Sequence, residues 1–490
     1  MLSKSNFMQF FRCSCELWLV KQRPDLVPPT DPALQRIFDE GNVIDAWAQK
    51  LFPNGVNVDG FGKPAAENTK KAIANGATVL LQPTFMTAKL SCRGDILTKN
   101  ADGSWDIYEV KSSTDVKEDH IVDVAFQRIC IEESGIRISR TFLVHVNNQY
   151  VRDGEIDPEQ LFSKIDITHE VENVMPMAKK EIPRALAVLD WDKVPRLMHV
   201  MSCNDPAECE FLACYFNTLD GDDKYSIAAS LPKEKLVSFL ERGLIKPDQI
   251  PADLMAELGD IKLPDAKAEP TLSIDEDAIK SELDGLVYPL YFLDYETQHS
   301  AVPTFDGYRP YQQMVFQYSV HVVREPGMEP EHYEFLADEM KDPAPIVAGS
   351  LKKHIGDVGS VIVWNARFEA SRNAEIGEHL PEFADFMADI NNRIYDLMMI
   401  VKKGYYVDSR FGGSASIKRV LPVMCPELSY NDLAIHEGGT ASASWATLTN
   451  AAIPPEQREQ LRKDMLAYCG LDTYAMVAIY RKFLDAVRSA

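Results

Sequence analysis

The chain has 490 residues, of which 46% are apolar and 26% are charged, and its formal net charge is −23. This length exceeds what one hydrophobic core usually supports, so two or three domains are expected. The acidic balance argues against a protein that coats nucleic acid non-specifically, because such proteins are basic overall.

No apolar run reaches the roughly 18 residues that a membrane span needs, so no membrane partner is expected. The N-terminal stretch has neither a long apolar segment nor a small-residue cleavage site. We therefore expect no signal peptide and, by default, a cytoplasmic location.

The first chemical pattern lies among predicted strands. Three strands, a helix and a fourth strand are predicted over 77–85, 90–100, 104–113, 122–135 and 140–147. Asn-Ala-Asp-Gly between the second and third strands is a hairpin signal. This order predicts a mixed α/β sheet, followed by a helix over 172–200.

Two acids and a lysine converge on this hairpin. Glu109 and Lys111 are two residues apart on one strand, so they share a face, and Asp95 belongs to the strand paired with theirs. The acids would hold a divalent cation, and the lysine would place positive charge near a scissile phosphate or the attacking water. The alternative is a hairpin with solvated surface charges.

This pattern resembles the PD-(D/E)xK nuclease fold in its RecB-like form. The resemblance implies that Gln127 joins the site from the following helix, as the first residue of the family's Gln-x-x-x-Tyr motif. Ile131 stands where that motif has Tyr. RecB-like nucleases usually place a His or an acid on an early helix, which makes Glu40 and Asp45 the candidates here.

Nine cysteines are present, and their odd number together with a cytoplasmic location disfavours a disulfide framework. Three fall in one C-x5-C-x4-C stretch and a fourth lies near the N-terminus: Cys203, Cys209, Cys214 and Cys13. Four thiolates suit zinc or an iron–sulfur cluster, spacing alone does not choose between these, and buried free thiols are the other alternative. The layout resembles iron–sulfur RecB-like nucleases and implies a 4Fe–4S cluster on these four residues. Cys15 is the alternative first ligand, and Zn²⁺ is the alternative metal.

An acidic segment with few large apolar residues, 259–285, is the best linker candidate. Small helices are expected before it, and a dense apolar run with strand character follows it. We therefore expect a nuclease domain, a helical segment with linker and a last domain, over 1–218, 219–285 and 286–490.

Three separated motifs place carboxylates in the last domain. Asp294 and Glu296 alternate onto one face of a strand, where two carboxylates repel unless cations lie between them, as in a two-metal phosphodiesterase. Glu369 lies in the first turn of a helix that follows a buried strand. Tyr468 and Asp472 are spaced i, i+4 and share a helix face, so one can hold a metal while the other orients the attacking water.

In this order and context, the motifs resemble the DEDD exonuclease superfamily, with its RNase H-like fold, in the branch that has Tyr-x-x-x-Asp in its third motif. The resemblance implies metal ligands at Asp294, Glu296, Glu369 and Asp472, with Tyr468 beside them. The second motif usually carries Asp, whereas this chain has Glu369. Asp396 is a further acid between the second and third motifs.

The two halves together resemble a bacterial family of uncharacterised proteins that joins an iron–sulfur RecB-like nuclease to a DEDD exonuclease-like domain. We therefore expect an α/β protein in which a restriction-endonuclease-like domain precedes an RNase H-like domain. The expected function is a nuclease dependent on Mg²⁺ or Mn²⁺ that acts on single-stranded or end-bearing DNA, in repair or defence. The alternatives are an RNA 3′–5′ exonuclease, a degenerate nucleic-acid-binding or assembly protein, and a zinc-stabilised interaction protein.

Overall fold

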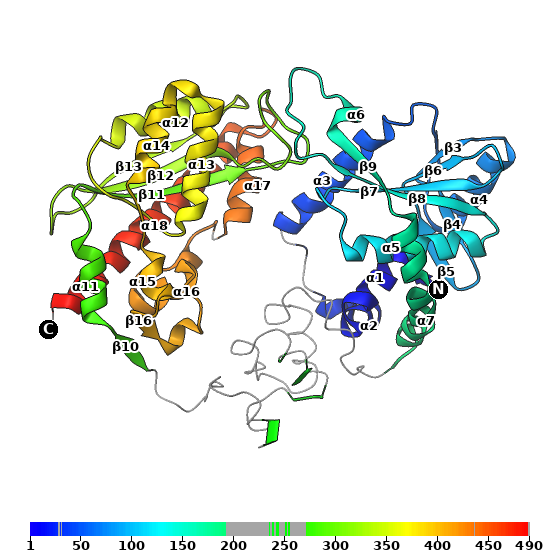
Figure 1. Ribbon diagram of the computed structural model, residues 1–490, viewed down its shortest axis with the longest axis horizontal. Helices are drawn as coiled ribbons and strands as arrows, with labels where there is room; N and C mark the ends of the chain where they lie inside the picture. Colours follow the sequence, from blue (N-terminus) through cyan, green and yellow to red (C-terminus); the bar gives the residue numbers. More distant parts are fainter. Residues whose placement is uncertain are drawn as a thin grey trace. The chain divides into compact units, whose positions relative to one another are not determined.

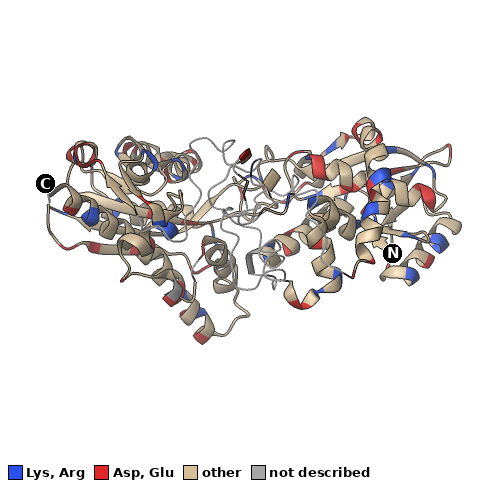
Figure 2. Cartoon of the chain, turned by 90° about the horizontal axis from the view of Figure 1, so that it is seen from below, with Lys and Arg blue, Asp and Glu red and all other residues tan. Residues whose placement is uncertain are grey.

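The computed structural model describes residues 1–27, 30, 32–192, 235, 238–239, 242–244, 250–251, 253–254, 271–435 and 437–488 (Figure 1). The chain divides into a first unit, Met1–Asp31 with Ile37–Lys267, and a second unit, Pro32–Arg36 with Ala268–Ala490. Both units combine helices with β-sheets, so the expected α/β class is confirmed. Acidic and basic residues are interspersed along the ribbon of each unit (Figure 2).

The elements up to residue 189 are β1 (Leu2–Ser3), α1 (Lys4–Arg12), α2 (Ser14–Gln22), η1 (Pro24–Leu26), α3 (Pro32–Gln49), β2 (Val56–Asn57), α4 (Gly62–Ala74), β3 (Val79–Leu81), β4 (Thr84–Met86), β5 (Leu90–Arg93), β6 (Ile96–Lys99), β7 (Trp105–Lys111), α5 (Glu118–Glu133), β8 (Ile138–Val146), α6 (Pro158–Leu161), β9 (Phe162–Asp166) and α7 (Thr168–Leu189). Six strands form one sheet in the order β2-β3-β6-β7-β8-β9. The predicted hairpin joins antiparallel β6 and β7, and α5 connects β7 to its parallel neighbour β8.

Two of the predicted strands are not continuous in the structure, so these predictions were wrong. Segment 77–85 breaks between β3 and β4, and segment 90–100 breaks between β5 and β6; β4 and β5 join β1 in a separate sheet. The first break falls at Gln82, whose φ of 55° is left-handed, and Pro83, which has no N–H for a strand ladder. The Gln82 N–H donates to the Asp95 carbonyl at 2.7 Å, so both breaks form one corner. Asp95 therefore lies at this corner, directly before β6.

The elements from residue 272 onward are β10 (Leu272–Ile274), α11 (Glu276–Asp284), β11 (Leu290–Gln298), β12 (Met314–Val323), β13 (Glu331–Leu336), α12 (Ala344–His354), β14 (Val361–Val363), α13 (Ala366–His379), η5 (Pro381–Phe383), α14 (Ala384–Asn392), β15 (Ile394–Asp396), α15 (Met398–Lys402), β16 (Tyr406–Asp408), η6 (Ser409–Phe411), α16 (Ile417–Met424), η7 (Tyr430–Asp432), α17 (Gly438–Leu448) and α18 (Pro455–Arg488). The main sheet has the order β13-β12-β11-β14-β15. β12 is antiparallel to its neighbours, whereas β14 is parallel to both β11 and β15.

Strand alternation on β11 separates the two cores of the second unit. Phe292 packs in the cluster that contains the apolar residues of α18, whereas Leu293 and Tyr295 pack in the cluster of α12, α13 and α14. Figure 1 shows these helices on opposite faces of the sheet. Asp294 and Glu296 have the same parity as Phe292, so they lie on the face that α18 covers.

Residues 271–285, the described part of the predicted linker, contain a strand and a helix. β10 pairs with β16, and α11 buries Ile279 and Leu283 in the core that includes α18. Three acidic residues of this segment lie at the start of α11. Glu276 and Asp277 are in its first turn, and the N-cap residue Asp275 accepts a hydrogen bond from the Ala278 N–H at 3.0 Å. Carboxylates are favourable at a helix N-terminus, so the acidic residues here are explained by the start of a helix.

None of the helices that the structure describes combines the length and the apolar character that crossing a bilayer requires. The predicted helix over 172–200 corresponds to α7, which begins at Thr168 and ends at Leu189, and residues 193–200 lie outside the described residues.

Candidate functional site

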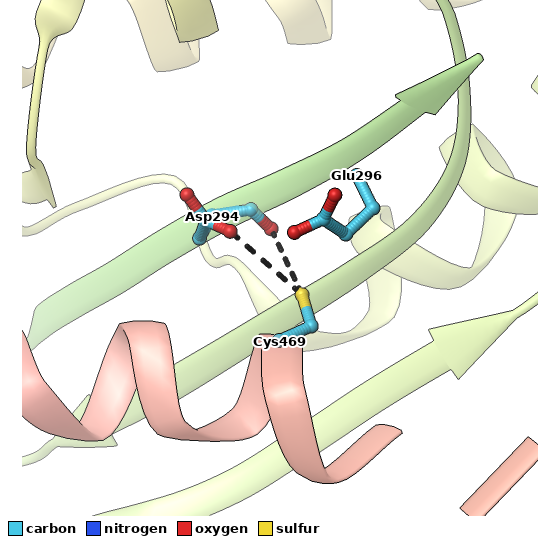
Figure 3. Close-up of side chains that lie close together, drawn as sticks. All are labelled: Asp294, Glu296 and Cys469. Carbon is cyan, nitrogen blue, oxygen red and sulfur yellow. Dashed lines mark hydrogen bonds between the residues drawn. The ribbon is translucent and has the colours of Figure 1, made fainter. Parts of the chain in front are cut away.

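The second unit brings its predicted carboxylates together between β11 and α18. Asp294, Glu296 and Cys469 each offer one donor atom within 4.8 Å of the other two. The Cys469 sulfur points from α18 toward the two carboxylates on β11 (Figure 3) and lies 3.8 Å from Asp294 Oδ2. Glu296 is 7% exposed and Asp472 9%, whereas Asp294 is half-buried. A ligand therefore has access to the group at Asp294.

Two polar contacts fix α18 against the sheet on either side of Cys469. The buried Gln317 side chain of β12 donates to the Met465 carbonyl at 2.9 Å. The hydroxyls of Ser319 and Thr473 lie 2.7 Å apart. Because these contacts bracket the helix turns between 465 and 473, Tyr468, Cys469 and Asp472 are held toward β11.

The carboxylates of this group carry raised pKa values. Burial, with repulsion from Asp472, raises the pKa of both Asp294 and Glu296 well above the ordinary range. Burial raises the pKa of Asp472 to about 6, although hydrogen bonds from Tyr430 and Tyr468 and the charge of Lys418 act in the opposite direction. Too little positive charge therefore lies near these carboxylates to stabilise their ionised forms.

Glu369 lies in the first turn of α13, as predicted, and is 2% exposed. Burial raises its pKa to about 8, and the charge of Asp396 adds to this shift. Its Oε2 atom is buried and has no hydrogen-bond partner among the described residues. Its charge acts on Asp294, so the longer side chain that departs from the family pattern still comes close to the group.

Asp396 binds backbone N–H groups of other residues, unlike the acids described above. Its carboxylate accepts hydrogen bonds from the backbone N–H groups of Asn365, Ala366 and Met398 at 3.0 to 3.1 Å. Asn365 has a φ of 100°, which is unfavourable for a residue with a side chain. Asp396 thus caps α13 and stabilises the turn that places Glu369, and it is a positioning residue.

Tyr430 is a member of this site that sequence reasoning missed. Its hydroxyl donates to Asp472 Oδ1 at 2.5 Å. Tyr430 lies in the short η7 turn, 42 residues before Asp472, and no spacing rule connects the two. Lys418 Nζ lies 5.8 Å from the Tyr430 ring centroid and 5.7 Å from that of Tyr468.

The first unit brings together its four predicted site residues: Asp95, Glu109, Lys111 and Gln127. Lys111 Nζ donates to Glu109 Oε1 at 2.7 Å, and the Gln127 amide donates to Glu109 Oε2 at 2.7 Å. Asp95 Oδ2 accepts from the Val110 N–H at 2.8 Å, which holds its carboxylate beside this strand. Ile131, where the family has Tyr, is fully buried in the apolar core.

Lys4 and Asp123 also belong to this group, although the sequence did not reveal them. Lys4 Nζ lies 3.0 Å from Glu109 Oε1 and 3.7 Å from Asp123 Oδ1, and Asp123 also pairs with Lys111. Burial opposes the charge of Lys4, but Glu109, Asp123 and Asp95 outweigh it and raise its pKa. Asp123 precedes Gln127 by one helix turn, a spacing that could have identified it; nothing in the sequence connects Lys4 to the site.

Of the two early-helix candidates, Asp45 is the acid whose charge acts on Asp95. Burial and the charge of Glu109 raise the pKa of Asp45 to about 6. With Asp45 included, four carboxylates meet the two ammonium groups and the Arg93 guanidinium, so the group still carries excess negative charge when every member is ionised.

Replacing Lys4 by Met tests this charge count. We expect Lys4→Met to lower the melting temperature in EDTA, because the carboxylates lose a compensating charge, and to enlarge the rise in melting temperature that Mg²⁺ produces. Thermal unfolding with and without Mg²⁺ measures both, with the exposed Lys21→Met on α2 as control. Equal Mg²⁺ shifts in wild type and Lys4→Met would show that Lys4 does not compete with a cation.

The predicted cysteine cluster remains a prediction. Cys203, Cys209 and Cys214 lie outside the described residues. Cys13 is half-buried at the junction of α1 and α2 and packs against the apolar core, where Cys15 is buried.

A family model described as "Domain of unknown function (DUF2779)" matches residues 291–416. The matched region begins in β11 and contains Asp294, Glu296 and Glu369, but it ends before Tyr430 and α18. It therefore covers only part of the carboxylate site.

Two curated proteins are similar to part of the chain. "Uncharacterized protein UU173" of Ureaplasma parvum serovar 3 is 27% identical over an alignment of 221 residues that covers 40% of this chain and 32% of that protein. "Uncharacterized protein MG366 homolog" of Mycoplasma pneumoniae is 26% identical over an alignment of 207 residues that covers 38% of this chain and 31% of that protein. The matches thus span just under a third of the length of each relative. These similarities carry no chemistry, so a function for the site has to be argued from its geometry.

Proposed function

We propose that this protein is a metal-dependent nuclease with one site in each unit, using Mg²⁺ or Mn²⁺ and preferring single-stranded or end-bearing DNA. The observation that carries the proposal is the meeting of four carboxylates, three of them buried, from β11, α13 and α18. Buried carboxylates with little compensating charge are unfavourable unless they take up protons or cations. Such groups are more common at functional sites than elsewhere.

The donor set fits hard divalent cations. Carboxylate oxygens are the ligands that Mg²⁺ and Mn²⁺ prefer, and Asp294, Glu296 and Asp472 supply them here. The buried Oε2 of Glu369, which lacks a hydrogen-bond partner among the described residues, is a further donor. Bound cations would stabilise charge on the phosphate and activate water.

The remaining side chains of this site orient these groups. Burial and the charge of Asp472 raise the pKa values of Tyr430 and Tyr468 far above the ordinary range, so both hydroxyls stay protonated and donate hydrogen bonds. Tyr430 holds one oxygen of Asp472 in place. Tyr468 hydrogen-bonds the same carboxylate and is the residue proposed to orient the attacking water.

The arrangement of the main sheet of the second unit supports the proposal. β11 lies at the centre, with antiparallel β12 on one side and parallel β14 on the other. This arrangement is consistent with the RNase H-like fold that the resemblance implies. In the first unit, the hairpin β6–β7 followed by α5 and parallel β8 is consistent with the PD-(D/E)xK fold.

The proposed site of the first unit is supported by the contacts of its side chains. Asp95 and Glu109 would hold the cation, Lys111 would place its charge beside the phosphate, and Gln127 orients Glu109 through its 2.7 Å hydrogen bond. The buried Gln127 Oε1 atom has no partner among the described residues, which leaves an acceptor for water or substrate.

The test is a cleavage assay with the full chain purified anaerobically, so that any iron–sulfur cluster is kept. Labelled single-stranded DNA, duplex DNA with free ends and RNA are incubated with Mg²⁺, Mn²⁺ or EDTA. Asp294→Asn and Lys111→Met assign activity to each unit. Preference for RNA would favour the RNA exonuclease, and cation binding without cleavage of any substrate would favour a degenerate binding protein.

The raised pKa values predict how Mg²⁺ binding depends on pH. Glu369, with a pKa of about 8, and Asp472, with a pKa of about 6, ionise at higher pH in the folded chain than in the unfolded chain. The metal-free protein therefore loses stability as pH rises from the ordinary carboxyl range toward 8, and cations restore it. We expect the Mg²⁺-induced rise in melting temperature to be larger at pH 9 than at pH 6. Glu369→Gln should remove most of the increase above pH 7, and an unchanged profile would contradict the assignment of Glu369 to the site.

Tyr430→Phe should shift the pH dependence of cleavage. Loss of the hydroxyl removes a donor to the ionised form of Asp472, so the pKa of Asp472 rises above its value of about 6. The acidic limb of the pH–rate profile should move to higher pH by roughly half a unit or more. Tyr288→Phe is the control, because its hydroxyl lies 2.9 Å from that of Tyr480, outside the carboxylate group. A purely structural role for Tyr430 would lower the rate without moving the limb.

A further inference from the structure

Cys469 differs from the other buried cysteines that the structure describes. Cys15, Cys92, Cys130 and Cys425 each pack in an apolar cluster. Cys469 is fully buried but belongs to none of the apolar clusters that the described residues form. Its sulfur instead faces the carboxylates of β11 (Figure 3). Packing in an apolar core therefore does not account for this side chain.

The donor atoms have the spacing of a cation site. Zn²⁺ binds thiolate sulfur at about 2.3 Å and carboxylate oxygen at about 2.0–2.2 Å, so tetrahedral geometry separates sulfur from oxygen by about 3.6 Å. The distance from Cys469 Sγ to Asp294 Oδ2 is 3.8 Å. All three donor atoms, with Glu296 included, lie within 4.8 Å of one another. Small side-chain rotations would bring them onto one ion.

We propose that Cys469 is a metal ligand, and that Cys469, Asp294 and Glu296 together bind one thiophilic divalent cation of the Zn²⁺ class. Three protein ligands leave a fourth position open, as in catalytic zinc sites. A thiolate donor favours Zn²⁺ over Mg²⁺ at the same oxygens. This assignment rests on the metal site of the proposed function and adds the preference of that site among cations. Zn²⁺ and Cd²⁺ displace Mg²⁺ from these three ligands.

Binding removes the thiol proton, together with any proton that Asp294 or Glu296 carries in the metal-free protein. In the metal-free protein, the thiol donates a hydrogen bond to Asp294, and burial among carboxylates raises its pKa. A divalent cation reverses the local field and deprotonates a coordinating thiol. The sulfur–metal bond forms as the sulfur–hydrogen bond breaks, and the proton passes to solvent without any change of oxidation state.

The test is a Cd²⁺ titration of the full chain with Mg²⁺ in excess, followed by the ultraviolet charge-transfer absorption of cadmium–thiolate bonds. Cys469→Ser keeps the volume nearly unchanged, and Cys425→Ser in the apolar core of the same unit is the control. Wild type and Cys425→Ser should each show one more cadmium–thiolate equivalent per chain than Cys469→Ser. Comparing variants cancels the signal of the other cysteines.

Equal absorption in wild type and Cys469→Ser would overturn the ligand assignment, even if both cleave DNA with Mg²⁺. A band that depends on Cys469 in a protein that cleaves nothing would support the assignment and count against the nuclease. Where cleavage is present, Zn²⁺ should inhibit the second unit of wild type at concentrations at least tenfold lower than those that inhibit Cys469→Ser. Asp294→Asn should weaken Cd²⁺ binding and reduce the Cys469 band, and an unaffected band would contradict a shared ion.

Discussion

Asp294→Asn should reduce Mg²⁺-dependent cleavage by the second unit at least about 100-fold, because even residues that only hydrogen-bond to a metal ligand typically contribute 10–100-fold. The change removes one carboxylate charge from the accessible side of the group and keeps the shape of the side chain. Initial rates on single-stranded DNA, measured in the Lys111→Met background, report the second unit alone.

The same substitution should stabilise the metal-free protein. The pKa of Asp294 is raised by burial and by Asp472, Glu296 and Glu369, so its ionised form is unfavourable near neutral pH. Removing that charge should raise the melting temperature in EDTA by roughly 2–4 °C, the change that about 1 kcal/mol produces in a domain of this size. Because Asp294 is half-buried, we do not expect a larger gain.

Asp464→Asn is the matched control, since Asp464 lies on α18 two turns before Asp472 and accepts a hydrogen bond from Gln460 at the helix surface. It should change neither activity nor stability appreciably. Loss of activity together with a lower melting temperature in Asp294→Asn would mean that the carboxylate serves the fold rather than the chemistry.

Glu109→Ala should cause the largest loss of stability in the first unit. Its carboxylate is 1% exposed and bonds to Lys4, Lys111 and the Gln127 amide. Removing one partner of a buried ion pair typically costs 3–5 kcal/mol, since the remaining charges stay unpaired. The side chains of Lys4 and Lys111 are 23% and 21% exposed and can turn partly toward water, so we expect a loss of about 3 kcal/mol.

Hydrogen–deuterium exchange localises this effect, because a chain with two units need not unfold in one step. The amides of β7 and α5 should exchange faster in Glu109→Ala, while those of β11 and α18 stay unchanged. Glu132→Ala removes a partly exposed partner of Arg128 and should cost no more than about 1 kcal/mol. If Glu109→Ala behaves like this control, the group is not held together by Glu109.

The pH dependence of the Glu109 contribution has a definite sign. Burial acts to raise its pKa, but Lys111 and Lys4 outweigh burial and lower it below the ordinary value. The stabilisation is therefore present above the unfolded pKa, about 4.3, and is lost as pH falls below it.

Local pattern was enough for much of the fold. The turn signal Asn-Ala-Asp-Gly identified the β6–β7 hairpin, and helical spacing identified α5 and most of α18. Period-2 alternation placed Asp294 with Glu296, and Glu109 with Lys111, on common faces. These relations depend on residues within one turn or one strand pair, where backbone geometry fixes which side chains meet.

Prediction from local pattern was not sufficient where the structural role of a residue depends on packing. The acidic segment before residue 286 has the composition of a linker, but Ile279 and Leu283 bury one face of α11, and Glu276 and Asp277 lie in its first turn. The strands around Asp95 looked continuous, but Gln82 and Pro83 turn the chain into a second sheet.

The sequence by itself predicted the two sets of proposed site residues, because each set lies on strands and helices whose periodicity is local. Only the tertiary structure decided which distant side chains complete them: Lys4 beside Glu109, Tyr430 on Asp472, and Cys469 against Asp294. The physical reason is separation along the chain. These contacts join residues 105, 42 and 175 positions apart, and no backbone period reaches that far, so only the packing of helices onto sheets brings them together.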